Sequence, residues 1–212
     1  MIGYEEAIAR VTAPGERYEL TEVTVGGQTL TAFRHAPPTL RQVFDTARAR
    51  GDRDFLVYED ERWSFTEVMA HVDALAHLLV EDHGVRRGDR VGIAMRNFPE
   101  WIVTFAAVTS IGAVAVALNA WWTSDELDYA LGDAEPVVLV ADAERTARAW
   151  PSCQRRDIAV IVVRAGDAVV PSGAARWEDV LPLGAAHPDV PVGPDDDATI
   201  LYTSGTTGRP KG

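Results

Sequence analysis

The stretch GDRVGIAMRNFPEWIVTFAAVTSIGAVAVALNAWWTSDEL, residues 88–127, alternates between strand-like and helix-like segments. A turn leads into a short apolar strand over residues 90–95, and a helix opened by Pro99 and Glu100 follows. A β-branched strand over residues 113–118 comes next. The order strand, helix, strand predicts the repeating unit of a parallel sheet whose helices cover its faces.

The same alternation continues toward the C-terminus. Thr123 and Glu126 begin another helix, and the apolar runs PVVLVAD at 136–142 and DIAVIVV at 157–163 are separated by a polar segment of helix length. A last strand starts the segment 198–203. We therefore predict an α/β fold with a mostly parallel sheet flanked by helices.

Toward the N-terminus, a helix capped by Thr39 starts the body of the chain. Ser64 and Glu67 form a capping box for a second helix whose apolar residues recur at helical spacing. Residues 1–38 mix short polar and apolar runs and end in prolines, so we expect an N-terminal extension there. Residues 39–212 then form the main part of the chain.

An uncharged run of membrane-spanning length, from Trp101 to Trp122, offers an alternative interpretation. Residues 110–112 interrupt it, its second half is strand-like, and the acidic Asp125, Glu126 and Asp128 follow it. A buried helix followed by a buried strand fits better, so no transmembrane segment is expected. Weak peripheral contact with a membrane stays open, and the two tryptophans are expected to pack or to line a pocket.

Composition narrows the classes of partner and location. The 212-residue chain is 47% hydrophobic and 25% charged, as soluble globular proteins are, and its net charge of -12 excludes a nucleic-acid partner because such a surface repels phosphate. The single cysteine, Cys153, has no neighbouring base and is given no role. The start MIGYEEAIAR resembles no signal or transit peptide, so a cytoplasmic location is expected, while the oligomeric state stays open.

The segment ATILYTSGTTGRPKG, residues 198–212, combines an apolar strand with a loop of glycines, hydroxyl side chains and one lysine. Glycines let backbone N–H groups approach an anion, hydroxyls add donors, and a lysine supplies positive charge. The loop is not the Walker sequence, because Pro210 and Gly212 stand where glycine and Ser or Thr are required. The residues predicted to bind phosphate are Thr203, Ser204, Gly205, Thr206, Thr207, Gly208 and Lys211.

The string TSGTTGRPKG, residues 203–212, resembles the signature phosphate loop of the adenylate-forming (AMP-binding) enzymes. This superfamily includes acyl-CoA synthetases, luciferases and the adenylation domains of peptide synthetases. The similarity extends upstream over roughly residues 39–212, and the run LNAWWTSDEL, residues 118–127, resembles the fatty-acid and other carboxylate CoA ligases more than the adenylation domains. The fold implied is the N-terminal part of the large domain of these enzymes, incomplete after the phosphate loop.

This resemblance implies a two-step reaction. A carboxylate, expected to be that of a fatty acid, attacks the α-phosphorus of ATP to give an acyl-adenylate and pyrophosphate, and the thiol of coenzyme A then displaces AMP. The loop would hold the β- and γ-phosphates, with Lys211 as the catalytic cation, and Thr203 would be a ligand of Mg²⁺. ATP, Mg²⁺ and coenzyme A are thus the expected cofactors and co-substrates.

Two alternatives remain open. An adenylating enzyme of the same superfamily can pass its acyl group to a carrier protein instead of coenzyme A. A chain that truly ends at Gly212 would be a non-catalytic nucleotide-binding module. We expect residues 1–212 to be a fragment of a longer enzyme, inactive without the later parts, and the acid it activates cannot be read from these residues.

Overall fold

The computed structural model describes residues 2–203 and 210–212. These residues form two compact units, one of Met1–Thr39 with Gly193–Asp195 and one of Leu40–Val192 with Asp196–Gly212. The N-terminal unit contains the helix α1 (Tyr4–Val11) and an antiparallel hairpin of β1 (Leu20–Val25) and β2 (Gln28–Phe33). Neither the helix nor the hairpin is predicted from the sequence of this part of the chain.

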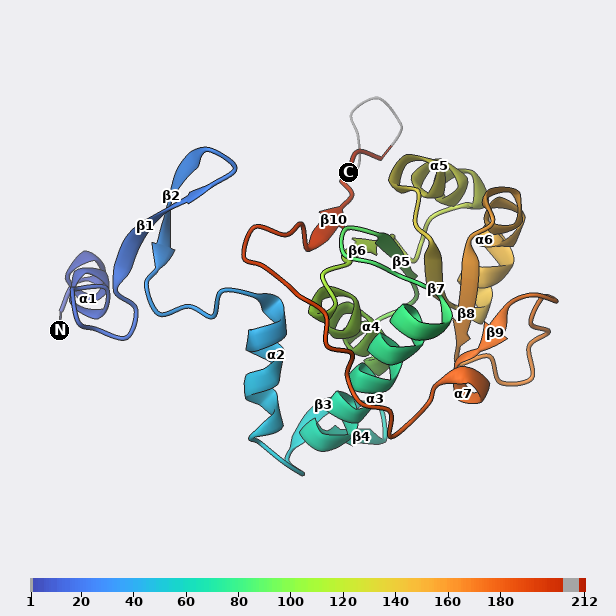
Figure 1. The fold of residues 1–212 in the computed structure, drawn as a ribbon, viewed down its shortest axis with the longest axis horizontal. Helices are drawn as coiled ribbons and strands as arrows, with labels where there is room; N and C mark the ends of the chain where they lie inside the picture. Colours follow the sequence, from blue (N-terminus) through green and yellow to red (C-terminus); the bar gives the residue numbers. More distant parts are fainter. Residues whose placement is uncertain (1, 204–209) are drawn as a thin grey trace. The chain divides into compact units, whose positions relative to one another are not determined.

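The larger unit is built around a six-stranded sheet in which every paired strand runs parallel to its neighbour, in the order β10-β6-β5-β7-β8-β9 (Figure 1). The strands of this sheet are β5 (Arg90–Ala94), β6 (Val114–Ala117), β7 (Val138–Asp142), β8 (Ala159–Val163), β9 (Ala175–Arg176) and β10 (Thr199–Leu201). This arrangement confirms the predicted α/β fold.

Helices cover both faces of the sheet. Residues of α2, α3 and α4 share one apolar core with Val91 and Ile93 of β5, whereas residues of α5 and α6 share a second core with Ala94 and Leu139. Side chains of successive strand residues point to opposite faces, which is why both cores draw on the same strands. The helices of this unit are α2 (Leu40–Arg48), α3 (Phe65–His77), α4 (Pro99–Ser110), α5 (Ser124–Ala134), α6 (Ala143–Arg156) and α7 (Trp177–Val180).

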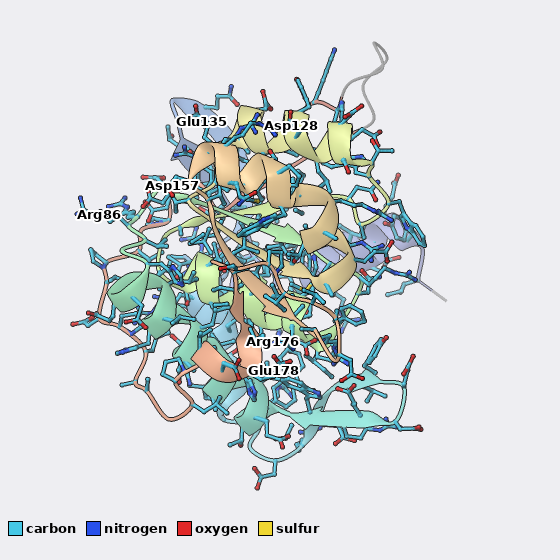
Figure 2. The ribbon with its side chains drawn as sticks, turned by 90° about the vertical axis from the view of Figure 1, so that its right-hand side faces the viewer. Arg86, Asp128, Glu135, Asp157, Arg176 and Glu178 are labelled. Carbon is cyan, nitrogen blue, oxygen red and sulfur yellow. The ribbon has the colours of Figure 1, made fainter. Side chains whose placement is uncertain are left out.

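Both capping boxes expected from the sequence are present. The hydroxyl of Ser64 accepts a hydrogen bond from the Glu67 N–H at 3.2 Å, and that of Thr123 accepts one from Glu126 at 3.4 Å. The helix begun at Ser64 continues beyond α3 as a π-helix, η1 (Leu78–Asp82). At their other ends α5 and α6 stop at Glu135 and Asp157, which have left-handed backbone conformations (Figure 2).

The uncharged run from Trp101 to Trp122 divides as expected into the end of α4, a turn and β6. No helix within the described residues has both the length and the apolar character that crossing a bilayer requires. At the turn, Gly112 has φ +72, and a Cβ added there would lie 3.2 Å from the side chain of Arg87. A glycine therefore allows the chain to reverse between α4 and β6.

A second antiparallel hairpin, of β3 (Asp54–Tyr58) and β4 (Glu61–Ser64), precedes α3. The connection from α7 to β10 runs along the helices of the larger unit (Figure 1). Along that path, Arg41 donates to the Val190 carbonyl at 2.9 Å and the Arg87 Nε donates to Asp196 at 2.8 Å. These bonds hold the segment that precedes β10 in place.

Candidate active site

The end of β10 carries the chain into the predicted phosphate loop, residues 203–211. β10 pairs in parallel with β6, which places Ile200 opposite Val116. Because the strands are parallel, their carboxyl ends share one edge of the sheet, where loops carry ligand-binding groups in open α/β sheets. Of the predicted phosphate-binding residues, Ser204, Gly205, Thr206, Thr207 and Gly208 lie outside the described residues.

The two described ends of the phosphate loop, Thr203 and Lys211, lie side by side as an antiparallel bridge. The Thr203 N–H donates to the Lys211 carbonyl at 2.9 Å, and the Lys211 N–H donates to the Thr203 carbonyl at 3.1 Å. The Thr203 hydroxyl donates to the Lys211 carbonyl across 3.4 Å, a long bond that leaves its oxygen lone pairs available. The backbones of Thr203 and Lys211 are thus held side by side, and both residues are exposed.

Tyr202, the residue before the loop, is attached to α5. Its hydroxyl donates to the Asp133 carboxylate at 2.7 Å, and its ring packs edge-on against Trp122 with a centroid distance of 5.6 Å. Burial of the ring and the hydrogen bond to Asp133 raise the pKa of Tyr202 above its ordinary value. On its other side lies Gly212, where an added Cβ would be 2.8 Å from the tyrosine ring.

A second site-forming feature is a crevice at the carboxyl ends of β5 and β7. The chain passes from β5 to β6 on one side of the sheet and then returns to β7 on the other side of β5. Such a reversal of strand order leaves a crevice outside the strand ends, and in α/β proteins this crevice is the usual ligand site. The helices α4 and α6 both begin at this edge, so the positive ends of their dipoles face it.

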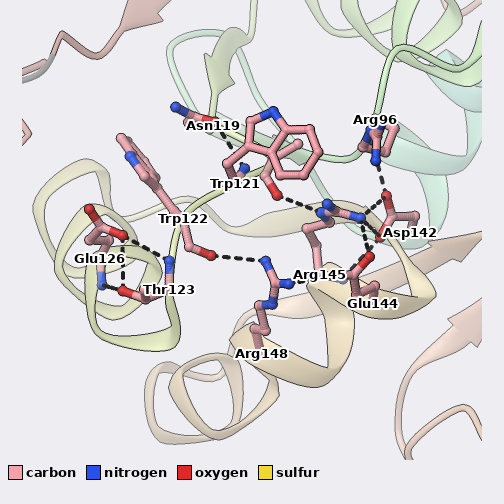
Figure 3. A network of polar contacts seen from close by, with 11 residues as sticks. Arg96, Asn119, Trp121, Trp122, Thr123, Glu126, Asp142, Glu144, Arg145 and Arg148 are labelled. Atoms are coloured by element: carbon pink, nitrogen blue, oxygen red, sulfur yellow. Dashed lines mark hydrogen bonds and ion pairs between the residues drawn. The ribbon is translucent and has the colours of Figure 1, made fainter.

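Asp142, the last residue of β7, organises the floor of the crevice (Figure 3). Its carboxylate accepts hydrogen bonds from the backbone N–H groups of Arg96 at 3.1 Å and Arg145 at 2.9 Å, so it joins the loop after β5 to the start of α6. The guanidinium of Arg145 is 2% exposed and donates to the Ala120 carbonyl at 2.7 Å. Its Nη2 atom has no hydrogen-bond partner among the described residues.

Above this floor, the Arg96 guanidinium lies 4.5 Å from the centre of the Trp121 ring. The ring is 70% exposed, which is unusual for so large an apolar group. Arg148 donates to the Trp122 carbonyl at 3.1 Å and also contacts Glu144 (Figure 3). The cavity here has a volume of about 410 Å³ and is lined by Tyr58, Arg96, Asn97, Phe98, Ala120 and Trp121.

The wall of this cavity is held by Arg164, which follows β8. Its guanidinium donates to both carboxylate oxygens of Glu61, at 2.7 and 2.8 Å, and to Glu100 at 2.9 Å. It also lies over the rings of Tyr58 and Phe98, at 5.0 and 4.9 Å from their centres. The hydrogen bonds from Arg164, with a further one from a tryptophan, lower the pKa of Glu61 to about 2. One arginine thus ties the β3–β4 hairpin to the start of α4.

A larger cavity of about 660 Å³ lies along α5 and is bordered by Pro210. Its walls carry Asp125, Asp128 and Asp133, with Arg156 as the counter-charge. Carboxylates repel phosphate oxygens, so this cavity does not suit a nucleotide in spite of its size.

The local motif predicts Thr203 and Lys211 as site residues, and this stays a prediction; the crevice is not predicted from the sequence. Arg96 and Trp121 come from two separate loops, and only the order of the strands brings them together. The available signal was that each follows a short apolar strand, at the position where ligand-binding loops occur. Trp101 and Trp122 pack as expected, because Trp101 stacks on Phe105 and Trp122 contacts Tyr202, while Trp121 lines the cavity.

Comparisons with known proteins agree with this arrangement. The chain is 33% identical over 161 residues to 2-succinylbenzoate–CoA ligase of Bacillus mycoides, covering 76% of this chain and 29% of the relative. It is 27% identical over 209 residues to the vanchrobactin synthetase VabF of Vibrio anguillarum, covering 97% of this chain and 7% of that protein. Among solved structures, apo MatB of Rhodopseudomonas palustris matches with a TM-score of 0.67 and 28% identity, covering 84% of this chain and 34% of MatB.

The chain spans only 7% and 29% of the length of these two curated relatives. Residues 43–212, which include the whole sheet, the crevice and the phosphate loop, match the family described as AMP-binding enzyme. The resemblance seen in the sequence is therefore confirmed, and the chain belongs to the AMP-binding enzyme family, whose members include the acid-activating CoA ligases.

Proposed function

We propose that this chain is part of an enzyme that activates a carboxylic acid with ATP and then transfers the acyl group to coenzyme A. The single observation that carries the proposal is the backbone pairing of Thr203 with Lys211, which joins the two ends of the predicted phosphate loop at the carboxyl edge of the sheet. Membership of the AMP-binding enzyme family supports it. A fatty acid is the substrate we favour, on the resemblance of residues 118–127 to fatty-acid CoA ligases.

In this proposal, the phosphate loop holds the β- and γ-phosphates of ATP. Lys211 is the catalytic cation, and Ser204, Gly205, Thr206, Thr207 and Gly208 supply further donors together with Thr203. Acyl-adenylate formation moves negative charge onto the departing pyrophosphate, and a fixed ammonium group stabilises that charge without reorganising water.

The donor set also fits Mg²⁺, which binds through one or two protein oxygens and the substrate phosphates. Among residues 2–203 and 210–212, the Thr203 hydroxyl makes one long bond, in which it is the donor, and the residue is exposed, so its lone pairs suit a cation. We assign Thr203 as the metal ligand of this chain. Mg²⁺ there would neutralise charge on the phosphate oxygens.

For the second step, the crevice offers a place for the nucleotide portion of coenzyme A. An exposed tryptophan next to an arginine provides a stacking surface for an adenine ring, and Arg96 provides charge for phosphate groups. The proposal also takes residues 1–38 as an N-terminal extension and residues 39–212 as the first part of the catalytic domain.

The test uses the full-length enzyme and separates the two steps. ATP–pyrophosphate exchange reports acyl-adenylate formation alone, and consumption of coenzyme A reports the whole reaction. Lys211→Ala removes a charge-assisted contact worth about 1.5 to 3 kcal/mol, so kcat/KM for ATP is expected to fall roughly 10- to 150-fold in the exchange assay. Arg96→Ala is the matched control, because it removes a cation near the other site.

For Arg96→Ala we expect a higher KM for coenzyme A and an unchanged exchange rate. An unchanged kcat/KM for ATP in Lys211→Ala would refute the assignment of the phosphate loop. If exchange proceeds and coenzyme A is never consumed, the acyl group goes to another acceptor, such as a carrier protein. If no carboxylic acid supports exchange, the chain binds nucleotide without catalysis and the proposal fails.

A further inference from the structure

Tyr202 connects the start of the phosphate loop to the helix α5. It directly precedes Thr203, and its ring lies where a side chain at Gly212 would be, with ring atoms 2.8 and 2.9 Å from an added Cβ. The tyrosine therefore touches or adjoins the chain on both sides of the loop. Thr203 and Lys211 are paired to each other, so whatever fixes one end also fixes the other.

The tyrosine is itself fixed from the opposite direction by α5. Its hydroxyl donates to the Asp133 carboxylate at 2.7 Å and lies 3.4 Å from the Ala130 carbonyl. A hydrogen bond to a charged group is stronger than one between neutral groups. The bond sets the rotation of the ring, which Trp122 then contacts edge-on. A phenylalanine would keep these ring contacts and lose the directional bond.

We infer that Tyr202 is a positioning residue for the phosphate loop: through its hydrogen bond to Asp133 it holds the paired ends, Thr203 and Lys211, in the arrangement that binds the phosphates of ATP. The inference rests on the proposed function. It assigns to Tyr202 no contact with ATP, so its effect is confined to where Thr203 and Lys211 lie.

The first test measures loop geometry without any ligand, by hydrogen exchange of the backbone amides of Thr203 and Lys211. Each of these amides donates to the other residue's carbonyl. In the full-length protein, Tyr202→Phe and Asp133→Ala should each speed their exchange roughly 5- to 30-fold, because each removes one hydrogen bond that restrains opening.

The matched control is Asp128→Ala, on the same helix. Asp128, labelled in Figure 2, accepts hydrogen bonds from Ser152, Arg155 and Arg156 of α6 at 2.6 to 2.7 Å. It should leave the exchange of the two loop amides unchanged. Equal acceleration in this variant would mean that α5 stabilises the fold in general, and would overturn the inference.

The second test measures ATP–pyrophosphate exchange in the same variants. The KM for ATP should rise by a similar factor in Tyr202→Phe and in Asp133→Ala, while the KM for the carboxylic acid stays the same. The double variant should be no worse than either single one, because both remove the same bond. Additive losses, or equal changes in both KM values, would overturn the inference.

The two tests distinguish failure of the proposed function from failure of the inference about Tyr202. If the unaltered enzyme activates no carboxylic acid, the proposed function fails, and the amide exchange rates still decide whether Tyr202 positions the loop ends. If activation occurs and the amides of Thr203 and Lys211 exchange at the same rate in Tyr202→Phe, the proposed function stands and the role given to Tyr202 is wrong.

Discussion

Replacing Arg164 by methionine should reveal how strongly one side chain holds the wall of the crevice. The variant keeps an apolar stem and removes the guanidinium that binds Glu61 and Glu100. The two carboxylates differ in surroundings, because the side chain of Glu61 is 40% exposed whereas that of Glu100 is 9% exposed. Most of the cost should therefore come from Glu100.

An exposed ion pair contributes about 0.2 to 1 kcal/mol, so loss of the Glu61 contact is a small effect. Removing one partner of a buried pair costs about 3 to 5 kcal/mol, because the other charge is left without compensation. Glu100 lies in the first turn of α4, where the helix dipole stabilises an anion by about 0.3 to 1 kcal/mol. We expect Arg164→Met to lower the free energy of unfolding by about 3 kcal/mol.

Urea unfolding followed by tryptophan fluorescence and by circular dichroism measures this value, from the midpoint at unchanged slope. Glu100→Gln in the Arg164→Met background should restore at least ~1 kcal/mol, because the amide carries no charge to leave unpaired. Arg155→Met is the control for an exposed arginine and should change stability by less than about 0.5 kcal/mol. A loss below ~0.5 kcal/mol in Arg164→Met, or no recovery in the double variant, would refute the reasoning.

Two further predictions concern the phosphate loop and the acid limit of stability. Gly212→Ala places a methyl group against the ring of Tyr202 and should raise the KM for ATP about 5- to 30-fold, as ~1 to 2 kcal/mol of crowding implies. Gly132→Ala, whose methyl group meets only the end of a flexible arginine, should leave that KM unchanged, and equal effects would contradict this account. Because Arg164 lowers the pKa of Glu61 from 4.5 to about 2, the pair contributes to stability above pH 4.5 and loses that contribution as the pH falls toward 2. The urea midpoints of the unaltered protein and of Glu61→Gln should converge over that interval, and a constant difference would show that the carboxylate does not titrate there.

The sheet was predictable because its strands are short apolar runs with clear ends. Val91 and Ile93 face one core while Ala94 faces the other, so β5 reads as a continuous apolar segment and not as an alternating one. The β3–β4 hairpin escaped prediction because its turn contains Glu59 at φ 49, in place of the glycine or asparagine that marks such turns. The π-helical end of α3 has no distinct sequence pattern either.

The residues of the candidate site likewise fall into two groups, those that a local sequence pattern predicts and those that depend on tertiary packing. Thr203 and Lys211 could be proposed as site residues because both belong to one continuous motif, and the structure adds that their backbones are paired. Arg164 could not, because its partners Glu61 and Glu100 lie far from it along the chain and the cluster depends on tertiary packing. Side chains that support a site from a distance leave no local pattern in the sequence.

The position of β10 at the edge of the sheet has a consequence for folding during synthesis. β5, α4, β6, α5, β7, α6 and β8 follow one another along the chain and pair with near neighbours, so this block can assemble as it emerges from the ribosome. β10 pairs instead with β6, from which β7, β8 and β9 separate it along the chain, and closing such a long loop is entropically costly and slow. The strand that carries the phosphate loop is therefore expected to join the sheet after β5, β6, β7 and β8 have paired.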